Sequence, residues 1–217
     1  MTQLEISIRF ELDTALHITG NRRVLGVDRP LALGTNGRPV IPATTIKGFL
    51  RDRAELLLTA FGQKVCRGPQ PRCWDTGPCL VCRVFGNPRQ EAALRFNDAV
   101  PASQVAADVR AGVGISRLRK AAITHRLFFV ETTTPGPSSW LASCTGYFAD
   151  EGSAREAAAL LDLACRWPWA VGGGKTRGLG WIGRLDLSAR VDGATLTRHD
   201  LVAIWQTWRA KPHVATP

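Results

Sequence analysis

The chain has 217 residues, enough for one elaborated domain with a sizeable buried core. Its 28 Lys and Arg against 18 Asp and Glu give a net charge of +10. This charge favours a protein that binds a polyanion; the alternative is a basic protein whose charge only keeps it soluble. No apolar run is long enough for a membrane span, and we interpret the polar start as excluding a secretory leader. Six cysteines without a leader indicate a reducing compartment. We therefore expect a cytoplasmic protein with no membrane contact.

The segment Leu4–Leu12 alternates apolar and polar residues without a break, which predicts a strand with one buried face. The connection after it is long and polar and contains Arg22, Arg23 and Asp28. Because long ordered loops in compact domains are often functional, we expect this connection to carry part of a site.

A helix is predicted after Pro42, because residues before a proline avoid helical angles and Thr44 or Thr45 can cap the helix that follows. Gly62 ends the pattern. The apolar residues recur at helical spacing and form one stripe, which consists of Ile46, Phe49, Leu50, Leu57 and Phe61.

Lys47 and Arg51 lie one helical turn apart, off that stripe, and therefore share one face of the helix. Two interpretations stay open at this point. The two cations can face a bound anion, or both can be solvated, with Arg51 paired to Glu55.

A segment rich in Pro and Gly holds four of the six cysteines, Cys66, Cys73, Cys79 and Cys82. Four thiols that include one Cys-x-x-Cys can form a tetrahedral shell around a structural zinc ion, which contributes folding free energy directly. A redox Cys-x-x-Cys is a weaker alternative, because that motif is followed by a helix and here Arg83–Gly86 follows. Reduced thiols without a metal are the third interpretation.

Further strands are predicted at Ala93–Asp98, Leu127–Thr132 and Trp140–Phe148, the last two separated by a turn at Pro135–Pro137. Between Val100 and Arg126 the chain is polar and basic without a firm period. We expect this stretch to form a protruding hairpin or arm.

Ser153 and Glu156 have the spacing of a capping box and predict a helix that runs to about Arg166. The alternating segment Trp181–Val191 predicts a final core strand, and His199–Trp208 predicts a terminal helix whose tryptophans pack on the domain rather than stack on bases. The order strand, helix, strand, strand, helix, strand indicates an α+β fold with a ferredoxin-like (RRM-like) βαββαβ core and long insertions.

The segment Ala170–Ile182 contains three consecutive glycines followed by two cations: Gly172, Gly173, Gly174, Lys175 and Arg177. Amide donors beside fixed positive charges are suited to phosphate oxygens, so we interpret the loop as a cradle for a polynucleotide backbone. A plain helix-to-strand turn and a small-anion site are the alternatives. A nucleotide-binding P-loop is excluded, because its first glycine would have to stand at Trp169.

Three segments together resemble the RAMP superfamily of CRISPR–Cas proteins, most closely the repeated backbone subunit of type III effector complexes. They are Gly172–Gly180, Ile41–Arg51, and the run from Cys82–Gly86 through Gly112–Arg117 to Leu127–Glu131. The second is similar to the family's Pro-Gly-Ser-Ser-Leu-Lys-Gly-x-x-Arg segment, except that Ala43 stands in place of the glycine.

The resemblance implies a filament of such subunits along a guide RNA, each with a thumb-like hairpin that kinks the guide–target duplex. It implies one RAMP domain over residues 1–217, with insertions at 14–42, at 63–90 for the zinc-binding cysteine loop and at 100–126 for the thumb-like arm. The expected partners are guide RNA, target RNA, further copies of the chain and other type III subunits. The implied RNA-binding residues are His17, Arg22, Lys47, Arg51, Arg117, Gly172, Gly173, Gly174, Lys175 and Arg177.

The resemblance also implies metal-dependent cleavage of target RNA by a ribose 2′-hydroxyl, helped by an aspartate after the first strand. Asp28 stands at that place, and a divalent ion such as magnesium is the implied cofactor. A turn-capping Asp28 is the structural alternative; Asp13 and Asp98 are weaker candidates. Nearby cations such as Arg29 can balance the developing charge.

Three other functions stay open. The same subunit can bind RNA without cutting it, or the chain can be a guide-processing RAMP endonuclease that uses His17 or His125 as a general base. A zinc-stabilised scaffold that binds only proteins is the alternative without nucleic acid.

Overall fold

Strand β1 (Thr2–Leu12) is the centre of the main sheet. It pairs antiparallel with β6 (Ser138–Phe148) on one side and with β7 (Ile182–Val191) on the other. From Leu4 onward, every second residue of β1 is apolar and buried, as the alternation predicts: Leu4, Ile6, Ile8, Phe10 and Leu12. The computed structural model describes residues 1–66, 73 and 77–210.

Three short strands extend the sheet. β2 (Leu94–Phe96) and β3 (Val100–Pro101) pair with β6, and β8 (Ala194–Thr195) pairs with β7, which gives the order β2-β6-β1-β7-β8 with β3 beside the path. All of these pairings are antiparallel. The chain is therefore a mixed α+β protein with antiparallel sheets, as predicted.

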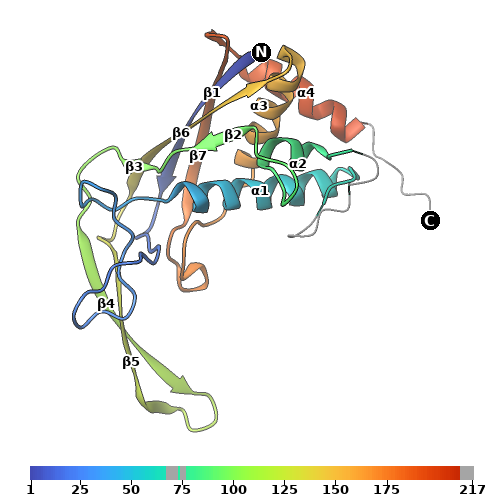
Figure 1. Cartoon of the computed structure of the whole chain (residues 1–217). Coiled ribbons are helices and arrows are strands. Elements are labelled where there is room, and N and C mark those ends of the chain that lie inside the picture. Colours follow the sequence, from blue (N-terminus) through green and yellow to red (C-terminus); the bar gives the residue numbers. More distant parts are fainter. Residues whose placement is uncertain (67–72, 74–76, 211–217) are drawn as a thin grey trace.

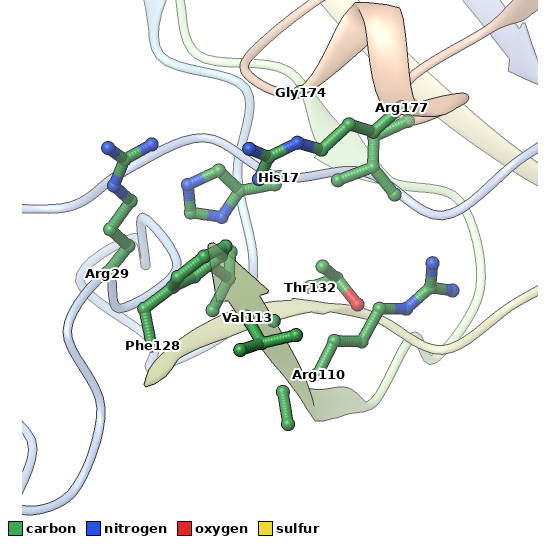
Figure 2. A pocket seen from close by; sticks show the side chains of 12 residues that line it. His17, Arg29, Arg110, Val113, Phe128, Thr132, Gly174 and Arg177 are labelled. Carbon is green, nitrogen blue, oxygen red and sulfur yellow. The ribbon is translucent and has the colours of Figure 1, made fainter. Parts of the chain in front are cut away.

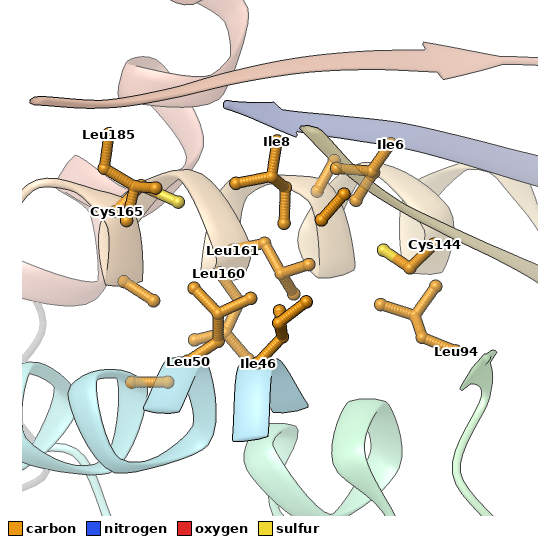
Figure 3. Packing of buried hydrophobic residues seen from close by; sticks show 14 of the residues in the cluster. Ile6, Ile8, Ile46, Leu50, Leu94, Cys144, Leu160, Leu161, Cys165 and Leu185 are labelled. Atoms are coloured by element: carbon orange, nitrogen blue, oxygen red, sulfur yellow. The ribbon is translucent and has the colours of Figure 1, made fainter. Parts of the chain in front are cut away.

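The helices gather on one side of this sheet (Figure 1). α3 (Glu151–Cys165) packs on β1, β6 and β7, while α1 (Ala43–Ala60) packs against α3 and β2. The short α2 (Leu80–Phe85) packs on α1, and α4 (Arg198–Ala210) packs on α3 with its tryptophans against the core. The core between sheet and helices includes Ile6, Ile8, Ile46, Leu50, Leu160 and Leu161 (Figure 3). None of the helices in the described part of the chain combines the length and the apolar character that a membrane crossing requires.

A second, two-stranded sheet forms the arm that the sequence predicts. β4 (Ala107–Ser116) and β5 (Ala121–Thr133) pair antiparallel and extend away from the body (Figure 1). The strand predicted over Leu127–Thr132 is confirmed, but it is longer than predicted: these residues are the base of β5 and pair with β4 rather than with the main sheet.

Two predicted helix caps were also wrong. α1 begins at Ala43, and its first amide donates to the Asp98 carboxylate at 2.8 Å, so neither Thr44 nor Thr45 caps it. Asp98, a weaker candidate for catalysis, therefore has a structural role. In α3 the cap is Asp150, whose Oδ1 accepts from the Ser153 amide at 2.8 Å, and the helix starts before the predicted capping box.

Candidate functional site

A groove of about 510 Å³ lies between the first turns of α1 and the loop that joins α3 to β7. Gly48 of α1 and Gly172 and Gly173 of the loop present backbone to it, and Lys175 contributes a charge. Surfaces without side chains let the backbone of a ligand approach closely. The lining is completed by Ile18, Thr19, Thr44, Thr45, Phe49, Asp52, Arg53, Trp169, Ala170 and Val171.

The glycines of this loop have the conformations that the sequence led us to expect. Gly172 and Gly174 have φ of +86° and +73°, and a Cβ on Gly172 would lie 2.4 Å from the His17 carbonyl oxygen. The Gly173 amide donates to that same carbonyl at 2.8 Å. The loop is thus fixed against the segment after β1, and one amide predicted to hold phosphate is used inside the protein.

The positive charge of the groove comes from Lys175. Within the described residues it forms no ion pair, and its Nζ lies 5.9 Å from the centroid of the Trp169 ring, which is itself packed edge-to-face on Trp181. Asp52, the one carboxylate of the groove lining, is paired with Arg53 at 2.5 Å. The charge of Lys175 is therefore left for a ligand.

Lys47 and Arg51 do not line this groove. The Arg51 guanidinium pairs with Glu55 at 2.7 Å and donates to the Gly86 carbonyl at 2.9 Å, beside α2. The structure therefore shows the ion pair that one of the two interpretations expected, and it does not bring Arg51 together with Lys175.

A buried network ties the long loop 14–42 to the base of β5. His17 is only 3% exposed, with Nδ1 2.7 Å from the Glu131 carbonyl and Nε2 2.9 Å from the Thr19 hydroxyl. The Glu131 carboxylate accepts from the Leu31 amide at 2.8 Å and pairs with Arg22. His17 and Arg22, both predicted to bind RNA, thus have partners inside the protein.

Replacing Glu131 with alanine is expected to lower the free energy of unfolding by about 1–3 kcal/mol, because the buried Leu31 amide loses its acceptor and Arg22 loses its partner. Urea denaturation measures this. Glu91→Ala is the matched control, since the pair that Glu91 forms with Arg95 is exposed on both sides and should change stability by less than about 0.5 kcal/mol.

A second cavity, of about 470 Å³, lies beside the hairpin and is lined in part by Asp28. Asp28 is exposed; its Oδ2 accepts from the Phe129 amide at 2.7 Å, and its own amide donates to the Phe129 carbonyl at 3.0 Å. Asp28 therefore binds across to β5 instead of capping a turn at Arg29. Its Oδ1 is left as an acceptor for a ligand. The other lining residues are Arg29, Gly114, His125, Arg126, Leu127, Phe128 and Arg177.

Asp28 is the one carboxylate among these lining residues. A single carboxylate does not form a protein cage for magnesium, but magnesium is often held by one or two carboxylates together with waters and substrate phosphates. Of the groups that hold magnesium in proteins, the lining thus offers the one carboxylate of Asp28, beside Arg29, Arg126 and Arg177.

Arg177 lies on the hairpin side of the glycine loop. Its guanidinium is 5.3 Å from the centroid of the Phe128 ring, and it lines both the Asp28 cavity and a cavity of about 310 Å³ beside His17 and Arg110 (Figure 2). Arg177 is thus separated from Lys175, with which the sequence grouped it. Arg117 is exposed at the far end of the hairpin.

The sequence did not single out Trp169, Arg53 or Phe128 as site residues, although they line the cavities. An aromatic residue just before a glycine loop was the one available signal for Trp169. Nothing local distinguishes Phe128 from a core residue, because it stands in an apolar run.

The four clustered cysteines meet as predicted. The Sγ atoms of Cys66, Cys73, Cys79 and Cys82 all lie within 4.8 Å of one another, a geometry that can hold a metal ion such as zinc. The redox interpretation is the weaker alternative from sequence because no helix is expected after the motif, and that reason was wrong: α2 begins directly after Cys79. The gathering of four thiols rather than two is what favours a metal.

Burial raises the pKa of the Cys82 thiol. Burial acts the same way on Cys73, but hydrogen bonds from the Cys79 amide and the neighbouring thiols outweigh it and lower the pKa of that thiol. Because a bound cation deprotonates the thiols that coordinate it, a metal would allow all four to be thiolates together.

Comparison with known proteins identifies a family and one partial relative. The model of the RAMP superfamily matches residues 9–183. A protein of Methanocaldococcus jannaschii named "CRISPR system Cms endoribonuclease Csm3" is 32% identical over 79 residues, which are 35% of this chain. The match covers 31% of the length of that relative.

Proposed function

The chain belongs to the RAMP superfamily, and on that premise we propose that it is a guide-RNA-binding backbone subunit of a type III CRISPR effector complex that also cuts target RNA. Its partners in this proposal are guide RNA, target RNA, further copies of the chain and the other subunits. The name of the Csm3 relative supports the type of complex and the endoribonuclease activity.

The topology supports a ferredoxin-like core for this subunit. The order β2-β6-β1-β7, with antiparallel neighbours and with α1 and α3 as the two crossover helices, is the order that a βαββαβ unit produces. The cysteine loop and the β4–β5 hairpin are then insertions in one RAMP domain, and the hairpin has the place of the thumb.

The observation that carries the proposal is the groove between α1 and the glycine loop. It combines backbone at Gly48, Gly172 and Gly173 with hydroxyls and the unpaired charge of Lys175. Such a surface suits the phosphates and sugars of a strand and reads no base, which fits a subunit whose sequence specificity comes from base pairing.

Cleavage is assigned to the Asp28 cavity. An ionised carboxylate can take the proton of a 2′-hydroxyl, and the guanidiniums of Arg29, Arg126 and Arg177 can balance the charge that develops on the phosphate. A divalent ion would be held by Asp28 and would supply further charge neutralisation when bound.

A subunit that binds RNA without cutting it is the second candidate. It is favoured by the hydrogen bond between Asp28 and the Phe129 amide, since this contact gives Asp28 a structural role of its own. A guide-processing endonuclease that uses His17 or His125 as general base is less well supported. Both His17 ring nitrogens have partners in the protein, and His125 lines the same cavity as Asp28.

The groove predicts a specific salt dependence. Binding of single-stranded RNA should weaken with a log–log slope of about −0.7 per phosphate contacted, and Lys175→Gln should make that slope shallower by about 0.7. Filter binding of the purified chain across a salt series measures it. Arg190→Gln, which removes an equal charge from an exposed position of β7 outside the groove, should leave the slope unchanged. A slope that does not respond to Lys175 contradicts the assignment of the groove.

A further inference from the structure

Strand β5 carries a bulge in the outer part of the hairpin, toward its tip. On one side of it Val113 pairs with Leu127, and on the other Ile115 pairs with Ala122, so residues 123–126 lie opposite a single residue of β4. Bulges interrupt the ladder and redirect side chains, and they are frequent next to active sites.

The bulge holds His125 in the left-handed backbone region, with φ of +58°. This conformation is uncommon outside glycine, costs free energy and is concentrated at functional sites. Gly114 makes room for the neighbouring Arg126, because a Cβ on Gly114 would lie 3.1 Å from the Cβ of Arg126. The strained backbone thus coincides with a residue whose side chain can do chemistry.

His125 and Asp28 line the same cavity of about 470 Å³. Asp28 and Arg29 come from the long loop, Arg126 accompanies His125 on the bulge, and Arg177 comes from the glycine loop. Three segments far apart in the sequence therefore bring a carboxylate, an imidazole and three guanidiniums to one place.

These groups differ in what they can do with a proton. Cleavage by an internal 2′-hydroxyl needs one group that removes the hydroxyl proton and one that protonates the departing 5′ oxygen. An ionised carboxylate only accepts, and a guanidinium does not give up its proton. Imidazole is the side chain that donates a proton near neutral pH, and His125 is the one imidazole among the residues that line this cavity.

We propose that His125 is the general acid of target-RNA cleavage, a role that rests on the function proposed above. The 2′ oxygen attacks the adjacent phosphorus and gives its proton to Asp28. The new O2′–P bond forms as the P–O5′ bond breaks, and His125 gives its proton to the leaving 5′ oxygen. The products are a 2′,3′-cyclic phosphate and a 5′-hydroxyl, and the step needs no further reactant.

The test compares two leaving groups in the assembled complex. One guide-complementary RNA has the normal linkage at the cleaved position, and the other has sulfur in place of the bridging 5′ oxygen, which leaves as a thiolate without protonation. His125→Asn is the informative variant, because asparagine tolerates the left-handed backbone and keeps the bulge. Thr124→Ala, in the same bulge but outside the cavity lining, is the control.

The complex with His125→Asn should cleave the normal RNA about a hundredfold more slowly than the wild type, and it should cleave the sulfur RNA at the wild-type rate. The complex with Thr124→Ala should behave as the wild type on both RNAs. An Asp28→Asn complex should be slow on both RNAs. If His125→Asn is equally slow on both, or unimpaired on both, His125 is not the general acid, although target cleavage stands. A wild-type complex that cuts neither RNA would overturn the cleavage function as well.

Discussion

Asp28→Asn should slow cleavage of guide-complementary RNA by the assembled complex by at least about a hundredfold, the usual contribution of a positioned general base. Asparagine still offers an oxygen to the Phe129 amide, so the contact between the long loop and β5 is retained while the charge and the basicity are lost. Single-turnover cleavage of end-labelled target RNA measures the effect, and guide RNA retained by the complex should be unchanged.

Asp98→Asn provides a matched control for this result. Asp98 also accepts a hydrogen bond from a backbone amide, that of Ala43 at the start of α1, but Asp98 lies outside the Asp28 cavity. A complex with Asp98→Asn should therefore cleave target RNA at the wild-type rate. If the complex with Asp28→Asn cleaves as fast as the wild type, the role of Asp28 is purely structural and Asp28 is not a catalytic residue.

The double variant Cys79→Ala with Cys82→Ala should lose bound metal and much of its stability. We propose that the four thiols hold one structural zinc ion, because their Sγ atoms already lie within tetrahedral reach of one another. Zinc binding in small sites has a gross free energy of roughly 10–16 kcal/mol, so its loss should lower the melting temperature strongly. Metal analysis should find about one zinc per wild-type chain and none in the variant.

Cys144→Ala is the control for the zinc prediction. Cys144 is buried in the core beneath the sheet, away from the cluster, and its loss should cost packing while zinc is retained (Figure 3). A wild-type protein that is fully folded without metal, or a double variant that keeps its zinc, would contradict the assignment.

The sequence was sufficient for features that depend on near neighbours. The alternation of Leu4–Leu12 predicts β1 because the period of a strand is local, and the glycines at 172–174 predict a loop with unusual backbone angles for the same reason. The cysteine cluster was predicted because thiols of this number and spacing have few other uses.

Features that depend on contacts between distant residues were not predictable in this way. α1 is capped by Asp98 rather than by a threonine beside it, and Arg51 is held by Gly86 as well as by Glu55. The cavity that joins Asp28 to His125 forms only because the bulge in β5 and the long loop meet. No periodic pattern in the sequence indicates contacts between segments this far apart, so the grouping of these residues was visible only in the structure.

The most direct test of the account is to purify the native assembly, cross-link it with ultraviolet light and identify both the nucleic acid and the cross-linked peptides. The account predicts a short RNA of defined length, cross-linked to the glycine-loop peptide that contains Trp169 and Lys175. An assembly without nucleic acid, or cross-links confined to the opposite, exposed face of the sheet around Arg9 and Arg184, would contradict it.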